Sequence, residues 1–247
     1  MKLEELIGKG TNNEVYRSGD AAVKIFRKDY KKADVLHEAF IAAKIEETGL
    51  NLPSVREVPM IDGKWAIVMD LVEGKTMKQM MEEDPDNLEK YVDQMVDIQL
   101  MIHNKKCDLL PHLRDKMISR INDADLDSTK RYELLTIMDG TPKHRKLCHG
   151  DFNPQNIVIS KGVPYILDWN HATQGNASAD VARSYLWLCL YNEKAADLYL
   201  NAFCEKSGTE KRYVQQWLPV VAAARLTKNI PEEQELLRRW IDVVQYE

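Results

Sequence analysis

Two carboxylates and one carboxamide stand close together in this sequence, at positions from which they could transfer a phosphoryl group. Asp151 lies in the segment CHGDFNPQN, Asn156 follows five positions later, and Asp168 follows Asp151 by seventeen. Phosphoryl transfer needs a carboxylate that orients the attacking hydroxyl and two hard oxygen ligands for Mg²⁺. The three residues are of the types that this chemistry requires. Whether they meet depends on the segments that separate them.

The segment between Asn156 and Asp168 has the pattern of a β-hairpin. Two short apolar runs, 157–159 and 165–167, flank a Lys-Gly pair that suits a tight turn. A hairpin folds its ends back toward each other, so the two flanking residues would lie close together. The spacing therefore predicts that two magnesium ligands reach one place, just after the loop that carries the first carboxylate.

These segments resemble the signature of a known family. HGDFNPQN followed by ILDWN is similar to the motif of the aminoglycoside phosphotransferases, which are relatives of choline kinase and more distantly of protein kinases. The family pattern is HGD, four residues, Asn, then a hydrophobic pair and Asp-Trp or Asp-Phe. The resemblance implies that Asp151 is the catalytic carboxylate and that Asn156 and Asp168 hold Mg²⁺. The alternative is an Asx-turn loop with a stray surface aspartate, which the agreement of several positions disfavours.

A lysine and a glutamate in the first third of the chain complete this resemblance. Lys24 interrupts the apolar strand AAVKIF, and Glu38 shares a face of the predicted helix 33–48 with apolar residues three, four and seven positions further on. Burying a carboxylate alone is costly, so we predict that Glu38 pairs with Lys24. The resemblance implies that Lys24 contacts the α- and β-phosphates of the nucleotide. The alternative is that both are solvated, with Glu46 or Glu47 as the helix partner.

Two further nucleotide contacts are implied by the resemblance. The segment around Gly8 and Gly10 is placed like the loop that covers the nucleotide, although Asn13 stands where protein kinases have a third glycine. The run WAIVMDLVEG is similar to the strand and hinge of the family, which implies that the Asp70 carbonyl and the Val72 N–H meet the adenine edge. The alternative for this run is a plain core strand that ends in a turn.

Two supporting residues are also implied by the resemblance. His149 is expected to brace the catalytic loop rather than to react. Asp180, in NASADVARSY, resembles the family's helix-start aspartate that hydrogen-bonds that loop. The alternative for Asp180 is a first-turn acid that the helix dipole favours, and both can hold.

Composition excludes several other classes of protein. Hydrophobic residues make up 44% and charged residues 30%, which is an ordinary globular balance. The net charge of -5 argues against a nucleic-acid partner. The four cysteines are scattered without a CxxC pair, and no apolar stretch is long enough to span a bilayer. The start MKLEELIGKG lacks the apolar core of a signal peptide, so we expect a cytoplasmic protein without a membrane partner.

The order of predicted elements indicates two lobes. Strand patterns and one helix fill residues 1–73, and helical patterns dominate residues 74–247, with predicted helix starts at Asp84, Ser178, Thr209 and Pro231. Residues 104–145 carry no clear pattern. We therefore predict an α+β, bilobal, protein-kinase-like fold, with a five-stranded antiparallel N-terminal sheet and a helical C-terminal lobe that binds the acceptor.

The resemblance implies transfer of the γ-phosphate of ATP or GTP, with Mg²⁺, to a hydroxyl of a small molecule such as an aminoglycoside, amino alcohol or sugar, by a monomer or homodimer. One alternative is a nucleotide-binding pseudokinase, and another is a protein Ser/Thr kinase. Protein kinases usually carry a lysine two residues after the catalytic Asp, where this chain has Asn153. Acidic residues such as Asp123 and Glu232 could recruit a cationic acceptor, but we interpret them as solvated.

Overall fold

The computed structural model describes residues 2–242, and their contacts divide them into two compact units. Unit 1 comprises the described residues up to Gln79 together with Gln155–His171, and unit 2 comprises Met80–Pro154 and the described residues from Ala172 onward. The sequence predicts two lobes that meet between residues 73 and 74, and this boundary stays a prediction. The contacts add that the segment 155–171 groups with the N-terminal sheet, although several helices separate the two in sequence.

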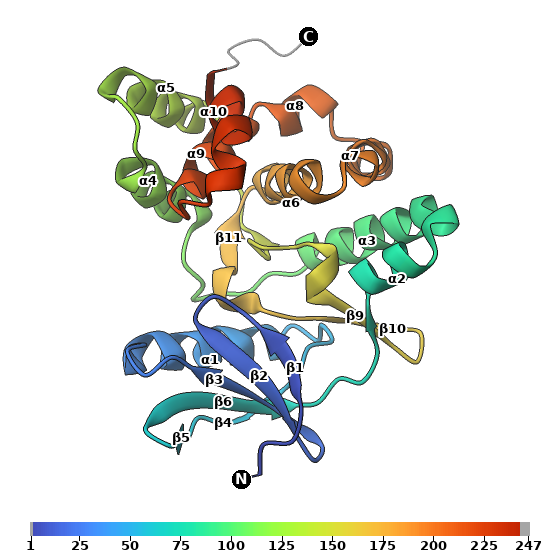
Figure 1. The fold of residues 1–247 in the computed structure, drawn as a ribbon. Coiled ribbons are helices and arrows are strands. Elements are labelled where there is room, and N and C mark those ends of the chain that lie inside the picture. Colours follow the sequence, from blue (N-terminus) through green and yellow to red (C-terminus); the bar gives the residue numbers. More distant parts are fainter. Residues whose placement is uncertain (1, 243–247) are drawn as a thin grey trace. The chain divides into compact units, whose positions relative to one another are not determined.

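Unit 1 is built on an antiparallel sheet, drawn in blue to teal in Figure 1. Its strand order is β1-β2-β3-β6-β4, and β5 pairs with β6. The strands are β1 Leu6–Lys9, β2 Asn13–Ser18, β3 Ala21–Phe26, β4 Val55–Glu57, β5 Met60–Ile61 and β6 Lys64–Asp70. The antiparallel N-terminal sheet that the sequence predicts is thus confirmed, with one short strand, β5, beyond the five expected.

Strand β3 is buried along its whole length and separates two apolar clusters. Side chains of a strand alternate between its faces, so Val23 packs with Ala66 on one side and Phe26 packs with Val35 of α1 on the other. Helix α1 spans Lys32–Glu46. By the same alternation Lys24 lies on the face of β3 that α1 covers, which places its ammonium group among the residues of that helix.

The predicted hairpin is confirmed. Strands β9 Ile157–Ser160 and β10 Val163–Ile166 pair antiparallel around Lys161 and Gly162, both with positive φ, and β7 Lys75–Thr76 extends this small sheet. Gly74, just before β7, has no space for a side chain, because an added Cβ would overlap the carbonyl group of Ile159. The hairpin is tied back to the rest of unit 1 by a hydrogen bond from the Ile166 N–H to the Asn51 carbonyl, 2.9 Å.

Unit 2 is mainly helical, as the sequence predicts. Its longer elements are α3 Leu88–His103, α4 Leu113–Asp123, α5 Ser128–Asp139, α6 Ala177–Tyr191, α7 Glu193–Ser207, α8 Lys211–Gln215, α9 Leu218–Leu226 and α10 Gln234–Asp242. Its two short strands, β8 Lys146–Cys148 and β11 Thr173–Gly175, pair antiparallel. Helix α2, Met77–Glu83, begins in unit 1 and ends in unit 2. Helices α6 and α9 pack against each other, and the alanines of α9 are buried at its centre.

Three predicted helix starts are shifted in the structure. A 3-10 turn, Pro85–Asn87, follows Asp84 before α3 begins, and another, Pro231–Glu233, precedes α10. Helix α8 begins at Lys211 rather than at Thr209. The fourth start is close to the prediction, since α6 begins at Ala177 and its cap, Asn176, accepts a hydrogen bond from the Ser178 N–H.

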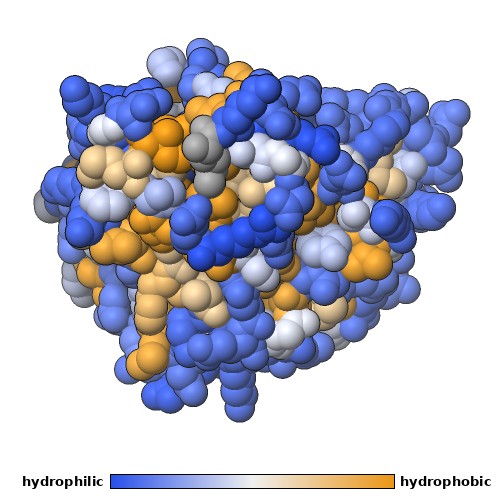
Figure 2. All heavy atoms as spheres, turned by 90° about the horizontal axis from the view of Figure 1, so that it is seen from below, coloured by the Kyte–Doolittle hydropathy of each residue, from blue (hydrophilic) through white to orange (hydrophobic). Residues whose placement is uncertain are grey.

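The surface mixes hydrophilic and apolar side chains. On the face seen in Figure 2, hydrophilic side chains are interspersed with separate apolar groups. Exposed apolar residues of unit 1 include Met60 and Leu6. Single exposed apolar side chains of this kind are usual on folded domains. None of the helices within residues 2–242 has the length and apolar character needed to cross a lipid bilayer.

Candidate active site

Lys24 forms the predicted ion pair with Glu38 in unit 1. Its Nζ lies 2.5 Å from Glu38 Oε1 and 3.3 Å from Asp168 Oδ1, and the Lys24 and Glu38 residues are only 8% and 9% exposed. Burial acts to lower the pKa of Lys24, but the negative charges of Asp168 and Glu38 outweigh it and raise that pKa above its ordinary value. A buried, charged ammonium group thus joins the helix carboxylate to the carboxylate at the end of the hairpin.

The hairpin brings Asn156 and Asp168 together as the spacing predicts. The Leu167 N–H donates to the Asn156 carbonyl at 2.8 Å, which links the residue before β9 to the residue before Asp168. Asp168 itself has a φ of 58°, in the left-handed region that side-chain-bearing residues seldom adopt. The Trp169 indole anchors this strained position by donating to the Ile166 carbonyl at 3.0 Å. Such strain is typical of functional positions, where the surrounding structure maintains it.

A cavity of about 310 Å³ within unit 1 connects the nucleotide-binding residues that the sequence predicts. Its lining includes Gly10, Lys24, Glu38, Asp70, Val72, Asn156 and Asp168. Gly8 is not among the lining residues; it lies in β1 opposite Val15, whose side chain does line the cavity. The cavity is of the size that small-molecule and cofactor sites commonly have.

The end of the cavity at β6 presents backbone groups. The N–H groups of Asp70 and Leu71 are bonded to the carbonyls of Ser54 and Asp20, at 3.0 and 3.1 Å. Within residues 2–242 we find no partner for the Val72 N–H, the next in the chain. A backbone donor that borders an apolar cavity can recognise the edge of a flat heterocycle.

The oxygen groups in this cavity suit Mg²⁺. Asn156 and Asp168 both line it, and Asn170, two residues further on, has a buried side-chain oxygen without a hydrogen-bond partner in the described part of the chain. Residues 2–242 hold no cluster of three or more His, Cys, Asp or Glu side chains that could form a complete cage. Mg²⁺ usually takes only one or two protein carboxylates and completes its shell with phosphates and water, so the donor set fits.

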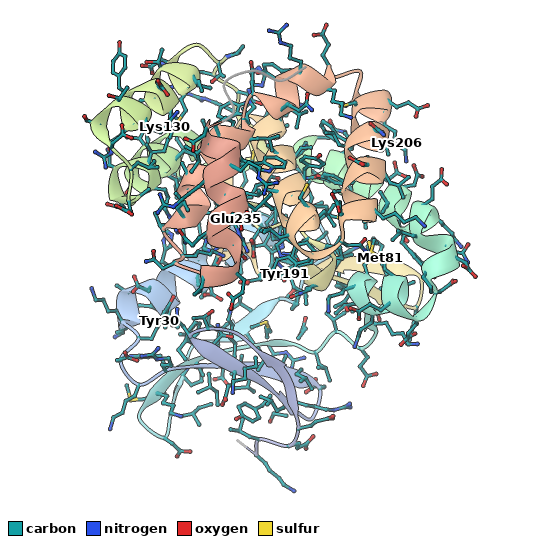
Figure 3. All side chains as sticks on the ribbon, turned by 45° about the horizontal axis from the view of Figure 1, so that its top comes forward. Tyr30, Met81, Lys130, Tyr191, Lys206 and Glu235 are labelled. Carbon is teal, nitrogen blue, oxygen red and sulfur yellow. The ribbon has the colours of Figure 1, made fainter. Side chains whose placement is uncertain are left out.

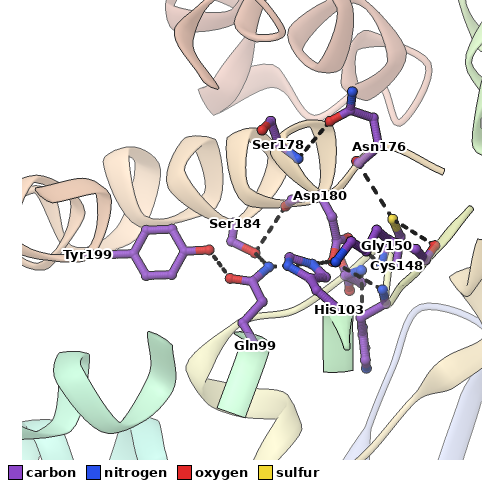
Figure 4. A network of polar contacts seen from close by, with 12 residues as sticks. Gln99, His103, Cys148, Gly150, Asn176, Ser178, Asp180, Ser184 and Tyr199 are labelled. Carbon is purple, nitrogen blue, oxygen red and sulfur yellow. Dashed lines mark hydrogen bonds and ion pairs between the residues drawn. The ribbon is translucent and has the colours of Figure 1, made fainter. Parts of the chain in front are cut away.

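In unit 2, the loop that carries Asp151 is held by the Asp180 carboxylate, as Figure 4 shows. Asp180 accepts hydrogen bonds from the backbone N–H groups of His149 at 3.1 Å and Gly150 at 2.7 Å, and it contacts His103 Nε2 at 3.1 Å. Burial acts to raise the pKa of Asp180, but the hydrogen bond and charge from His103 outweigh it and lower that pKa. The contact between Asp180 and the loop, which the resemblance implied, is thus present.

The same network extends along helix α6 to α3 and α7. The Gln99 amide donates to Asp180 and to Ser184, both at 3.4 Å, and the Tyr199 hydroxyl donates to Gln99 (Figure 4). All of these side chains are buried. His103 and Gln99 are therefore positioning residues that the sequence did not single out, since nothing in a helical repeat shows which polar residue faces a distant carboxylate.

Asp151 is held by its neighbours on both sides. Its N–H donates to His149 Nδ1 at 3.2 Å, and Asn153 donates to its backbone carbonyl at 3.0 Å. The Asp151 carboxylate faces Arg183 of α6, with Oδ1 at 3.6 Å from Nη2. Arg183 was likewise not predicted as a site residue from the sequence. It stands three residues after Asp180, so the two occupy neighbouring positions on one helix.

Comparison with known proteins gives a consistent picture. The model of the phosphotransferase enzyme family matches residues 4–217 of the chain. None of the curated proteins compared with the chain matches it.

Several solved structures share the fold. A thermostable mutant of aminoglycoside phosphotransferase APH(4)-Ia in its apo form gives a TM-score of 0.68 at 16% identity, over 97% of this chain and 92% of that one. Choline kinase LicA from Streptococcus pneumoniae gives 0.67 at 13% identity, over 98% and 92%. The amicoumacin kinase hAmiN gives 0.64 at 12% identity, over 96% and 86%.

At such low identities these structures show the fold, and the fold is the protein-kinase-like one that the sequence predicts. The family match is independent of them and covers most of the chain. It includes the HGDFNPQN and ILDWN segments on which the resemblance depends. The chain therefore belongs to the phosphotransferase enzyme family.

Proposed function

We propose that this protein is a Mg²⁺-dependent kinase that transfers the γ-phosphate of ATP to a hydroxyl group of a small molecule. The observation that carries the proposal is the contact of Lys24 with both Glu38 and Asp168 at a cavity of nucleotide-binding size. Two structures with the same fold add support: a thermostable APH(4)-Ia mutant in a ternary complex with ADP and hygromycin B, and hAmiN in complex with AMP-PNP and Ca²⁺.

In this proposal unit 1 binds the nucleotide. Lys24 contacts the α- and β-phosphates and Glu38 holds it there, while Gly8 in β1 and Gly10 in the turn after it belong to the segment that covers them. The Asp70 carbonyl and the Val72 N–H meet the adenine edge. Asn156 and Asp168 hold Mg²⁺, which when bound neutralises charge on the phosphates.

Asp151 acts on the acceptor in this proposal. Its carboxylate orients the attacking hydroxyl and accepts its proton as the hydroxyl oxygen bonds to the γ-phosphorus and the bond from that phosphorus to the ADP oxygen breaks. Only five positions separate Asp151 from Asn156, so the chain limits the distance between their Cα atoms to about 18 Å even when fully extended. The covalent link thus sets an upper limit on the separation of the proposed base and the proposed metal ligand.

The experiment that tests the proposal combines binding with turnover. Calorimetric titration with AMP-PNP, with and without Mg²⁺, measures nucleotide binding, and ADP release with mass analysis of amino sugars, amino alcohols and sugars measures transfer. Lys24→Met should weaken binding of Mg-AMP-PNP by about tenfold or more, since it leaves Glu38 and Asp168 without their cation. Lys64→Met, at an exposed position of the same sheet, is the matched control and should bind normally.

Each alternative has its own outcome. Binding without turnover of any acceptor, hydroxy acids and sugar phosphates included, would identify a regulatory nucleotide-binding module, and transfer to a peptide alone would identify a protein kinase. Absence of Mg-AMP-PNP binding to the wild-type protein would refute the proposal altogether.

A further inference from the structure

Five cationic side chains gather beside Asp151 in unit 2. They come from helices that are far apart in the sequence, α4, α6 and α9, and from the turn after α9. With three apolar residues they line a cavity of about 20 Å³. This set, called the cationic cluster below, consists of Lys116, Arg120, Arg183, Arg225 and Lys228.

The cluster is adjacent to the proposed catalytic carboxylate. Arg183 lies 3.6 Å from Asp151, and the charge of Asp151 acts on Lys116 and Lys228 as well. The side chains of Arg183 and Asp151 are 19% and 21% exposed, so a ligand can reach both. A group bound by the cluster would therefore lie next to the carboxylate that is proposed to orient the acceptor hydroxyl.

Besides Arg183, which faces Asp151, Arg225 and Arg120 contact neighbouring side chains. Arg225 donates to Glu233 at 2.5 and 2.6 Å, and Glu233 also accepts from the hydroxyl of Tyr191, whose position Figure 3 marks. Arg120 donates to the hydroxyl of Thr227 at 3.0 Å. These contacts join α4, α6 and the segment before α10 to α9.

The negative charge around the cluster is smaller than its positive charge. Within residues 2–242, the carboxylates whose charge acts on its members are Asp151, Asp180 and Glu233, three against five cations. Asp180 already accepts from the catalytic loop and His103, and Glu233 from an arginine and a tyrosine. The charge of Asp151 acts on four of the five cations, Lys116, Arg183, Arg225 and Lys228, in a chain whose net charge is -5.

The pKa of Lys116 reflects its burial and then the positive charge around it. Burial, and then the charges of Arg183 and Arg120, lower the pKa of Lys116 to about 7, and the charge of Asp151 opposes them only in part. A lysine in such surroundings gains more from a bound anion than a lysine in water does, because the anion offsets both the lost hydration and the neighbouring cations.

We propose, on the basis of the proposed function, that the cationic cluster binds a carboxylate or phosphate group of the acceptor. Lys116, Arg183 and Lys228 would hold this group while a nearby hydroxyl of the same molecule meets Asp151. A cavity of about 20 Å³ has room for one small group rather than for a ring. The acceptor class is therefore a small hydroxyl compound with one acidic group, such as a hydroxy acid or a sugar phosphate. Polycationic amino sugars and choline would be repelled.

The first test needs no knowledge of the natural acceptor. Protein saturated with Mg-AMP-PNP, so that its nucleotide site is filled, is titrated with inorganic phosphate and with glycerate by calorimetry. We expect binding in wild type and a loss of about tenfold or more in the double variant Lys116→Met/Lys228→Met, since charge-assisted contacts dominate. Lys194→Met, an exposed lysine of α7, is the charge-matched control and should bind like wild type. Thermal denaturation checks that each variant is folded. If the double variant is unfolded, the single variant Lys228→Met, at an exposed position, is compared with wild type instead.

The second test uses matched acceptors with Mg-ATP. Glycerate is compared with glycerol, pantothenate with panthenol, and glucose 6-phosphate with glucose, with choline as the cationic member, and ADP release is measured. Under the proposal, the acidic member of each pair is turned over at least about tenfold faster than the other member at equal concentration. The glycerate and pantothenate pairs test a carboxylate, and the glucose 6-phosphate pair tests a phosphate, so the panel shows which acidic group the cluster prefers.

The outcomes separate this inference from the proposed function. Failure to bind Mg-AMP-PNP counts against the kinase itself. Equal turnover of neutral or cationic partners, or phosphate binding that the double variant leaves unchanged, overturns the acidic-acceptor inference while the kinase stands. If no acceptor in the panel is turned over, the phosphate titration alone decides.

Discussion

At the scale of single residues, the proposed roles separate binding from chemistry. Lys24 contacts both Glu38 and Asp168 in unit 1, where the cavity lies. Asp151 lies in unit 2, where it is oriented by the loop and faces Arg183. Substitutions in the two groups should therefore change different measured quantities.

Asp151→Ala should leave Mg-AMP-PNP affinity within about twofold of wild type and reduce kcat by about 10²–10⁴-fold, because a general base contributes to this extent. Calorimetry and ADP release with an accepted substrate provide the two numbers. A collapse of nucleotide affinity with turnover near the wild-type rate would show that the role is assigned to the wrong residue.

Asp168→Ala should weaken Mg-dependent nucleotide binding and abolish transfer. It removes a proposed metal ligand and one of the two carboxylates that Lys24 contacts. The difference between AMP-PNP titrations with and without Mg²⁺ is the relevant measurement. If that difference is the same in the variant as in wild type, Asp168 does not hold the metal.

We expect Lys116 to make the stability of the protein depend on pH. Its folded-state pKa of about 7 lies below the ordinary 10.5, so between these values the unfolded chain binds a proton that the folded chain lacks. The Lys116 contribution to the free energy of unfolding therefore rises with pH across this window. Lys116→Met, which removes a charge crowded by Arg183, Arg120, Arg225 and Lys228 and opposed by Asp151, should stabilise the protein more at pH 6.5 than at pH 9.5. Urea denaturation at both pH values measures this, and a stability difference that is independent of pH would contradict it.

At the scale of elements, two connections position the site. The β9–β10 hairpin brings Asn156 and Asp168 together, and the first turn of α6 holds the loop that carries Asp151. In both cases the backbone is constrained by a contact between segments that are distant in sequence. Each contact can be weakened by one small substitution.

Asp180→Asn should cost about 1.5–3 kcal/mol of stability and lower kcat. The amide keeps one acceptor but loses the charge that strengthens the bonds from His103 and the loop N–H groups. Denaturant midpoints and turnover measure the two effects. Asp197→Asn, an exposed aspartate of α7, is the control. Wild-type stability in Asp180→Asn would show that the network is not energetically important.

Gly74→Ala should destabilise unit 1 by about 1–3 kcal/mol, because its Cβ would overlap the Ile159 carbonyl of the hairpin. Gly140→Ala is the matched control, since a Cβ there meets its nearest neighbours at 3.6 and 3.7 Å and φ is -75°. It should change stability little or raise it slightly. Equal effects in the two variants, measured by urea denaturation, would mean that the close approach at Gly74 is relieved at no cost.

At the scale of the whole molecule, the short connection between Asp168 and Asp180 limits what the enzyme can act on. The turn Trp169–His171, strand β11 and the cap Asn176 fill this connection. A protein kinase uses a much longer segment here, which phosphorylation orders. We therefore expect that unmodified recombinant protein is active on small acceptors. Protein that is inert toward every small acceptor, yet phosphorylates a peptide after treatment by another kinase, would overturn this prediction.

The sequence by itself determined the residues that lie close together along the chain. The spacing of Asp151, Asn156 and Asp168 and the pattern of the hairpin depend on local turn chemistry, which one segment contains in full. Lys24 and Glu38 could be paired for a related reason, since a charge in an apolar pattern requires a partner. These signals were enough to predict the family and the fold class.

The tertiary structure alone decided which distant residues meet. Lys116, Arg183 and Arg225 stand on three helices that share no local pattern, and helical periodicity does not show which face of one helix opposes which face of another. Gly8 illustrates the same limit, because whether it or its neighbour borders the cavity depends on the register of β1 with β2. The charge around Asp151 is set by packing, so the proposed reaction rests on the sequence as well as on the structure, whereas the proposed acidic acceptor rests on the structure alone.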